Sequence, residues 1–164
     1  MGHRALVAYE RPDGWACHRS QWGAHQLRLQ TEVTAETPFG RPPDDPPVEQ
    51  TPRRRVESFD EVVAAVDFLA HEAIYVVDSA FAVTSYVAVW LGVETGASNE
   101  RDPSDGVCVA VADDAEAETL RRRIRVLKTV LGRAVDDGRL DEAVASRRLE
   151  RRVRALAGDR RVLP

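Results

Sequence analysis

The sequence has 164 residues, of which 43% are hydrophobic and 30% are charged, and its formal net charge is −4 at pH 7. A chain of this length is typical of one domain with a substantial core. No apolar run approaches the roughly 18 residues that a membrane-spanning helix needs, and no hydrophobic signal segment follows the first basic residues. We therefore expect a cytoplasmic protein with a single domain, residues 1–164, and no membrane contact.

Basic residues are unevenly distributed along the chain. Residues 1–112 contain 9 Arg against 17 acidic residues, whereas residues 113–164 contain 13 Arg and 1 Lys against 10 acidic residues. Lys128 is thus the only lysine among 23 basic residues, a bias that we interpret as a property of a GC-rich genome. Cys17 and Cys108 are expected to be free thiols in a reducing compartment.

The first 25 residues concentrate histidine, cysteine and tryptophan on one predicted hairpin. Residues 4–9 form an apolar run that predicts a buried strand. Pro12-Asp13-Gly14 predicts a turn, because Pro presets φ and Gly tolerates a positive φ. Residues 15–19 then return as the partner strand, with three to five connecting residues. A short helix is expected to follow, ending near Gln30.

Residues 36–55 contain six prolines and few apolar side chains. Proline lacks an amide donor, so no regular element is expected here, and we favour a mobile surface loop over an ordered lid. Ser58-Phe59-Asp60-Glu61 is a capping box, in which the Ser58 oxygen and the Glu61 carboxylate satisfy amides at a helix start. Apolar residues then recur at helical spacing, which predicts an amphipathic helix over 58–71.

Three apolar runs follow this helix. Residues 73–77 and 81–93 predict a second hairpin, and residues 107–112 predict a buried strand. Acidic residues from Asp113 predict a helix start, and two apolar stripes on either side of Gly138 predict an αα-hairpin over 114–158. The expected fold class is α+β: an antiparallel sheet of about five strands, two hairpins plus one strand, packed by one central helix and a C-terminal helical hairpin.

Several segments carry a resemblance to a known family. MGHRALVAYERPDG, HRSQWGA and TAETPFG, with FLAHEAIYVV and FAVTSYVAVWLG further along, resemble an uncharacterised family of small haloarchaeal proteins, a domain of unknown function. The resemblance covers roughly residues 1–95. Gln21 stands where members of that family often carry a second histidine. Because the family has no established activity, the resemblance implies a salt-accumulating source and no mechanism.

Histidine and glutamate side chains raise one enzymatic hypothesis. A metal-dependent hydrolase would use His18, His25, His71 and Glu72, because imidazole binds Zn²⁺ and a carboxylate can activate the bound water. The spacing matches no recognised metal motif, and Cys17 and His18 point to opposite faces of a strand. A Cys or Ser nucleophile has less support, since no nucleophile motif is present. We expect no catalytic residues and no cofactor, and keep the hydrolase as the alternative.

Arginine-rich helices raise a second hypothesis, contact with nucleic acid. Two clusters, residues 121–125 and 147–154, contain nine arginines, and guanidinium groups pair well with phosphates. Tyr9, Trp15 and Trp22 interleave with arginines on the first hairpin, an arrangement suited to stacking unpaired bases. Acidic residues lie on the same helices at salt-bridge spacing, so an internally paired, solvated helix face is the simpler interpretation.

A small non-enzymatic binding protein requires the fewest assumptions and is the function that we expect. The unequal charge of the two parts favours self-association or docking to an acidic protein, and nucleic acid is the further partner considered. The sequence does not identify the protein partner. Candidate binding residues lie on the first hairpin, just after it, and on the last helix: Tyr9, Trp15, His18, Arg19, Trp22, His25, Arg147, Arg148, Arg151 and Arg152.

Overall fold

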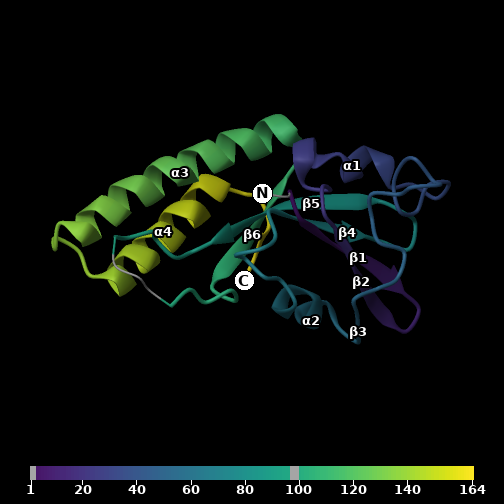
Figure 1. Cartoon of the computed structure of the whole chain (residues 1–164), viewed down its shortest axis with the longest axis horizontal. Coiled ribbons are helices and arrows are strands. Elements are labelled where there is room, and N and C mark those ends of the chain that lie inside the picture. Colours follow the sequence, from purple (N-terminus) through teal and green to yellow (C-terminus); the bar gives the residue numbers. More distant parts are fainter. Residues whose placement is uncertain (1–2, 97–99) are drawn as a thin grey trace.

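Seven strands form one mixed sheet in the computed structural model, which describes residues 3–96 and 100–164 (Figure 1). The strand order is β3-β2-β1-β4-β5-β6-β7. β1 and β4 run parallel, and the other neighbouring pairs are antiparallel. The strands are β1 (Ala5–Arg11), β2 (Gly14–Ser20), β3 (Arg54–Val56), β4 (Ala73–Val77), β5 (Val83–Trp90), β6 (Gly106–Val111) and β7 (Val162–Leu163).

The prediction of a five-stranded antiparallel sheet was wrong. The two edge strands, β3 and β7, have only three and two residues, too few to produce an alternating pattern. The parallel pair arises because the long connection between β2 and β4 carries the chain back across the sheet, so that β4 lies beside β1. Parallel strands require a crossover of about a dozen residues or more, and this connection supplies it.

Both predicted hairpins are confirmed. β1 and β2 pair from Ala5 opposite Ser20 to Arg11 opposite Gly14, which leaves a two-residue turn instead of the expected three to five. Gly14 has φ of +136°, and a Cβ there would lie 2.3 Å from the backbone oxygen of Val56. The glycine therefore allows β3 to approach the turn closely.

Helices cover the two faces of the sheet unequally (Figure 1). The 3₁₀-helix η1 (His25–Leu27), α1 (Leu29–Glu32), α3 (Asp114–Asp136) and α4 (Glu142–Ala157) lie on one face, and α2 (Phe59–Ala64) lies on the other. Tyr75 and Val87 belong to the larger core, whereas Ile74 and Tyr86 belong to the smaller one. Burial on both faces explains why β4 is apolar throughout and why β5 is apolar apart from Thr84 and Ser85.

The helix predicted over residues 58–71 begins correctly but ends early. Ser58 and Glu61 form the expected capping box, and α2 ends at Ala64. Further on, the Asp67 carboxylate accepts hydrogen bonds from the amides of Leu69 and Ala70, which diverts the backbone from helical pairing. The Phe68 amide donates to the carbonyl of Pro103, a contact with a distant segment that sequence periodicity does not register.

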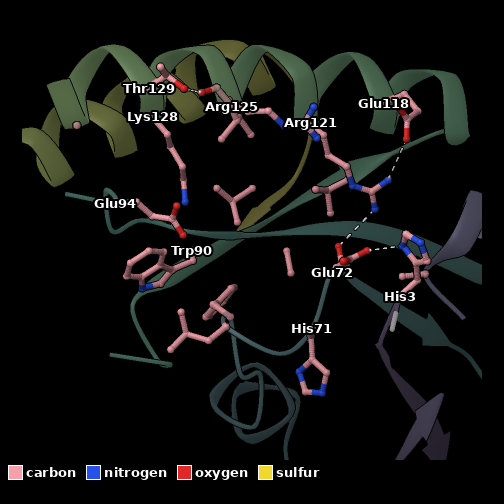
Figure 2. Close-up of a pocket in the computed structure, with 18 of the residues that line it drawn as sticks. His3, His71, Glu72, Trp90, Glu94, Glu118, Arg121, Arg125, Lys128 and Thr129 are labelled. Carbon is pink, nitrogen blue, oxygen red and sulfur yellow. Dashed lines mark hydrogen bonds and ion pairs between the residues drawn. The ribbon is translucent and has the colours of Figure 1, made fainter. Parts of the chain in front are cut away.

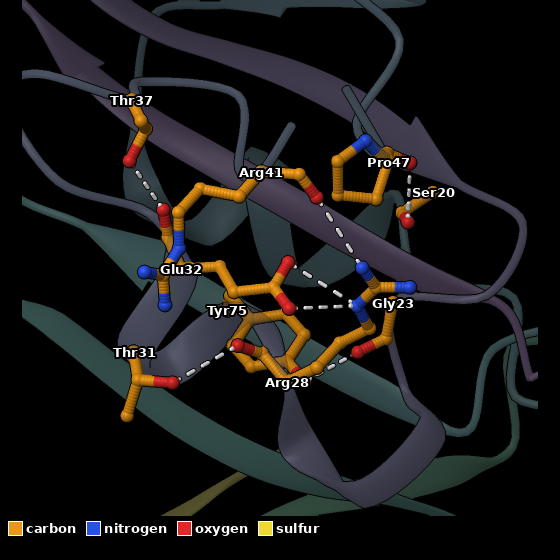
Figure 3. Close-up of polar contacts among 9 residues, drawn as sticks. All are labelled: Ser20, Gly23, Arg28, Thr31, Glu32, Thr37, Arg41, Pro47 and Tyr75. Carbon is orange, nitrogen blue, oxygen red and sulfur yellow. Dashed lines mark hydrogen bonds and ion pairs between the residues drawn. The ribbon is translucent and has the colours of Figure 1, made fainter. Parts of the chain in front are cut away.

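The proline-rich segment 36–55 packs against the sheet, whereas a mobile loop was expected. The Tyr9 hydroxyl donates to the carbonyl of Pro38 at 2.6 Å, and the Ser20 hydroxyl donates to that of Pro47 at 2.7 Å. Val48 is fully buried. Figure 3 shows that Arg28 of the α1 region pairs with Glu32 and also donates to the carbonyl of Arg41, which ties the segment to α1.

The C-terminal helical hairpin is present as α3 and α4. Asp113 caps α3 by accepting from the amide of Glu116 at 2.8 Å. Gly138 has φ of +69° in the link between the two helices, a conformation that glycine adopts without strain. Asp141 caps α4 through the amides of Ala143 and Val144. Within residues 3–96 and 100–164, none of the helices combines the length and apolarity that crossing a membrane requires.

Candidate functional site

A groove of about 930 Å³ lies between α3 and one end of the sheet (Figure 2). The Ala88 amide donates to the carbonyl of Glu72, and β5 then continues to Trp90 beyond the start of β4. Residues along α3 line the groove opposite the end of β5. The space between them becomes the groove, with Val87 and Val89 on its apolar floor.

One end of the groove is built around Lys128. Its Nζ atom lies 4.9 Å from the centroid of the Trp90 ring, and the guanidinium of Arg101 lies 5.5 Å from the same ring. Figure 2 shows the Lys128 side chain pointing from α3 toward Trp90 and Glu94. Burial, the largest influence, lowers the pKa of Lys128 from 10.5 to about 8, and Glu94 and Asp105 oppose that shift.

The other end of the groove is organised by Glu72. Its carboxylate contacts Nδ1 of His3 at 2.9 Å. Arg121, whose side chain is 22% exposed, reaches the backbone carbonyl of Glu72 at 3.5 Å and the carboxylate of Glu118 at 3.9 Å. The His25 ring lies 5.0 Å from that of His3. This end therefore combines imidazoles, carboxylates and one half-buried guanidinium.

The four residues proposed as metal ligands do not converge. His25, His71 and Glu72 line the groove, but His18 lies elsewhere, buried with its Nδ1 atom donating to the carbonyl of Glu49 at 2.7 Å. Nδ1 of His71 accepts from the amide of Asp67 at 3.1 Å. In the part of the chain that the structure describes, no three His, Cys, Asp or Glu residues have an arrangement that could hold a metal ion. The geometry thus gives the hydrolase alternative no support.

The aromatic residues predicted to form one surface on the first hairpin lie in different parts of the structure. Tyr9 is 1% exposed and contacts the His18 ring edge-on at 5.0 Å. Trp15 packs on the opposite face against Phe59, with ring centroids 5.3 Å apart. Trp22 is 53% exposed, and Arg19 donates to the side chain of Gln21. Because side chains alternate across a strand, these aromatic rings do not form one stacking platform.

The arginines predicted on the last helix remain together on its surface. Arg147, Arg148, Arg151 and Arg152 are exposed on α4, and none has a carboxylate within 4.0 Å among the described residues. Arg154 differs, since it pairs with Glu150 at 2.9 Å. The expected internal pairing therefore does not neutralise this group, which we call the α4 arginine face.

Two histidines make folding stability dependent on pH. Burial is the largest influence on both His18 and His71, and it lowers the pKa of each below 6.5. The unfolded chain then binds more protons than the folded chain at mildly acidic pH. Stability is therefore retained above about pH 6.5 and lost as pH falls from there through the folded-state pKa values.

We expect the free energy of unfolding to fall by at most about 1.4 kcal/mol per pH unit for each histidine below pH 6.5. Urea unfolding at a series of pH values from 8 to 5 measures this. His18→Gln should flatten the dependence relative to that of the wild type. Equal pH dependence in wild type and His18→Gln would contradict the prediction.

Sequence reasoning named His25, His71 and Glu72, which line the groove, as candidate metal ligands, but it did not identify the residues around Lys128. Lys128, Trp90, Glu94 and Arg121 come from segments separated by as many as 38 positions, and no motif joins them. One signal was present. Lys128 is the single lysine of the chain, but this was attributed to codon composition because its burial is set only by tertiary packing.

Comparison with known proteins identifies a family. The model described as a family of unknown function (DUF6735) matches residues 1–53 and 43–163, two segments that overlap. No curated protein and no solved structure matches the chain significantly. The matched segments together reach from the opening strand to β7, and they extend the expected resemblance through the C-terminal helices. The chain therefore belongs to DUF6735, a family of unknown function.

Proposed function

We propose that this protein is a small non-enzymatic binding protein that contacts nucleic acid through the α4 arginine face. The observation that supports the proposal is the group of four exposed arginines without carboxylate partners in the described chain. They are spaced i, i+1, i+4 and i+5, so they lie along one side of the helix. This spacing presents two rows of guanidinium groups to a polyanion.

Electrostatic repulsion favours a ligand at this face. Like charges four residues apart destabilise a helix by a few tenths of a kcal/mol for each pair, on the order of 0.2–0.5 kcal/mol. A phosphate backbone removes that repulsion, and each guanidinium can donate two parallel hydrogen bonds to one phosphate. Binding of this kind depends on the backbone and not on base sequence.

We further propose a haloarchaeal source and a cytoplasmic location, supported by the resemblance of residues 1–95 to small haloarchaeal proteins. High salt changes which contacts contribute to the free energy of binding. At an ionic strength of about 1 M the Debye length is only about 3 Å, so charges act over contact distance alone. Bidentate Arg–phosphate hydrogen bonds retain strength under these conditions better than long-range attraction does.

Double substitution of the α4 arginine face should reduce the salt dependence of binding. Arg147→Gln/Arg151→Gln removes two phosphate contacts, which lowers the slope of log K against log [KCl] by about 1.8 for a duplex. Fluorescence anisotropy with labelled 20-mer duplexes and single strands, at KCl from 0.1 to 2 M, measures the slope. Two unrelated base sequences should give the same result.

A charge-matched variant provides the control. Arg54→Gln/Arg55→Gln removes two exposed arginines from β3 and should leave the slope unchanged. Circular dichroism establishes that both variants are folded. Equal slopes in the two double variants, or no binding at 0.1 M KCl, would contradict the proposal and leave a protein partner as the expected ligand.

A further inference from the structure

The Lys128 end of the groove differs chemically from the arginine-rich surface around it. Figure 2 shows the Lys128 side chain extending from α3 into the groove, and its Nζ atom lies 4.9 Å from the Trp90 ring centroid. The groove, of about 930 Å³, gives small molecules access to this amine. Arginine stays protonated under all physiological conditions, whereas a lysine can become a neutral nucleophile.

Charged groups on three segments face Lys128. Glu94 follows β5, Arg101 lies in the next connection, and Asp105 immediately precedes β6. Glu94 and Asp105 favour the ammonium form, and Arg101 disfavours it. Burial, assisted by Arg101, outweighs the two carboxylates, and with the resulting pKa of about 8 a substantial share of the amine is neutral at pH 8. An ordinary lysine, with a pKa near 10.4, is less than about 1% neutral at that pH.

We propose that Lys128 is an amine nucleophile that binds carbonyl compounds carrying a carboxylate or phosphate, as a reversible imine. Arg125 supports the anionic part of this assignment. It is exposed, it lines the same groove, and it precedes Lys128 by three residues, so the two positions lie on the same side of α3. The proposal concerns the groove and is independent of the α4 arginine face.

The bond changes balance without an oxidant or reductant. The lone pair of the neutral Nζ atom attacks the carbonyl carbon, an N–C bond forms as the C–O π bond breaks, and one proton passes from nitrogen to the oxygen to give a carbinolamine. Loss of that oxygen as water leaves a C=N bond, and the second proton on nitrogen departs with it. The net reaction is amine plus aldehyde or ketone giving imine plus water.

Because the chain has one lysine, amine labelling has only two targets, Lys128 and the terminal α-amine of the purified protein. Pyridoxal 5′-phosphate serves as the probe, because it carries an aldehyde and a phosphate. The wild-type protein is incubated with it in amine-free buffer, reduced with borohydride, digested and analysed by mass spectrometry. We expect Lys128 to be the principal target, with a labelling midpoint near pH 8.

Matched variants and a second probe test whether Arg125 binds the anionic group of the carbonyl compound. Pyridoxal, which lacks the phosphate, should label Lys128 about tenfold less well, the effect of losing one charged hydrogen bond. Arg125→Gln should reduce labelling by pyridoxal 5′-phosphate to the level seen with pyridoxal. Arg122→Gln, an exposed neighbour on α3 outside the groove lining, should label like the wild type.

Two outcomes would overturn the assignment of Lys128 as a nucleophile, and a third would overturn the role of Arg125. Preferential labelling of the terminal amine would show that the groove does not activate or admit the probe. A labelling midpoint above pH 10 would show that Lys128 behaves as an ordinary solvated lysine. Identical labelling of Arg125→Gln and Arg122→Gln would remove the assignment of Arg125 to the anionic group.

Discussion

Tyr75→Ala is expected to lower the free energy of unfolding by about 4 kcal/mol, within the range for removing a buried aromatic side chain. Tyr75 is fully buried in β4, near the middle of the sheet, and belongs to the larger core. Its hydroxyl donates to the carbonyl of Gly23 at 2.6 Å (Figure 3). The substitution therefore leaves a cavity and also removes the partner of a buried backbone oxygen.

Urea unfolding monitored by circular dichroism measures this loss. Tyr75→Phe keeps the ring and removes only the hydroxyl, so we expect it to cost about 1 kcal/mol. Leu69→Ala, at a side chain that is 43% exposed, should change stability by less than about 0.5 kcal/mol. A Tyr75→Ala protein as stable as Tyr75→Phe would contradict the packing of β4 described here.

Gly132→Val should destabilise the fold by about 3 kcal/mol, the upper part of the range for overpacking. Gly132 is buried on α3, and a Cβ at this position would lie 2.6 Å from the backbone oxygen of Glu94. Backbone cannot move aside as a flexible side chain can, so α3 and the segment after β5 must separate. Because both line the groove, the variant should also weaken labelling of Lys128.

Thermal and urea unfolding of a second glycine variant test whether the destabilisation of Gly132→Val has a steric cause. Gly96→Val is the control, because its Cβ would meet only the Asp136 carboxylate, at an ordinary 3.7 Å. We expect that variant to remain within about 0.5 kcal/mol of the wild type. Similar losses in both variants would indicate a general cost of valine near this end of α3 and not a close backbone contact.

Local signals in the sequence determined much of the secondary structure. Ser58 and Glu61 lie three residues apart, and their reciprocal hydrogen bonds need no other part of the chain. The turn before Gly14 and the cap at Asp113 are equally local. The largely apolar composition of both faces of β5 is typical of a strand that is covered on each side, as β5 is.

The α4 arginine face and the first hairpin could be predicted from the sequence to different degrees. Arg147, Arg148, Arg151 and Arg152 could be placed on one helix side from their spacing, because helical periodicity is a property of neighbouring residues. Whether carboxylates neutralise them depends on rotamers and distances, which only the folded structure supplies. His18 and Trp15 were grouped as one surface, although alternation along β2 places their side chains on opposite faces of the sheet.

Tertiary structure alone decided the parallel pairing of β1 with β4 and the groove, and it set the early end of α2 together with the local hydrogen bonds of Asp67. Each depends on contacts between segments far apart in the chain, such as the Phe68 amide with Pro103 or Lys128 with Trp90. The sequence by itself determined helix caps, tight turns and apolar periodicity, because hydrogen bonds and side-chain directions within a few residues produce those signals. The order of strands and the burial of one lysine follow from how distant apolar faces pack together, and no local pattern encodes that packing.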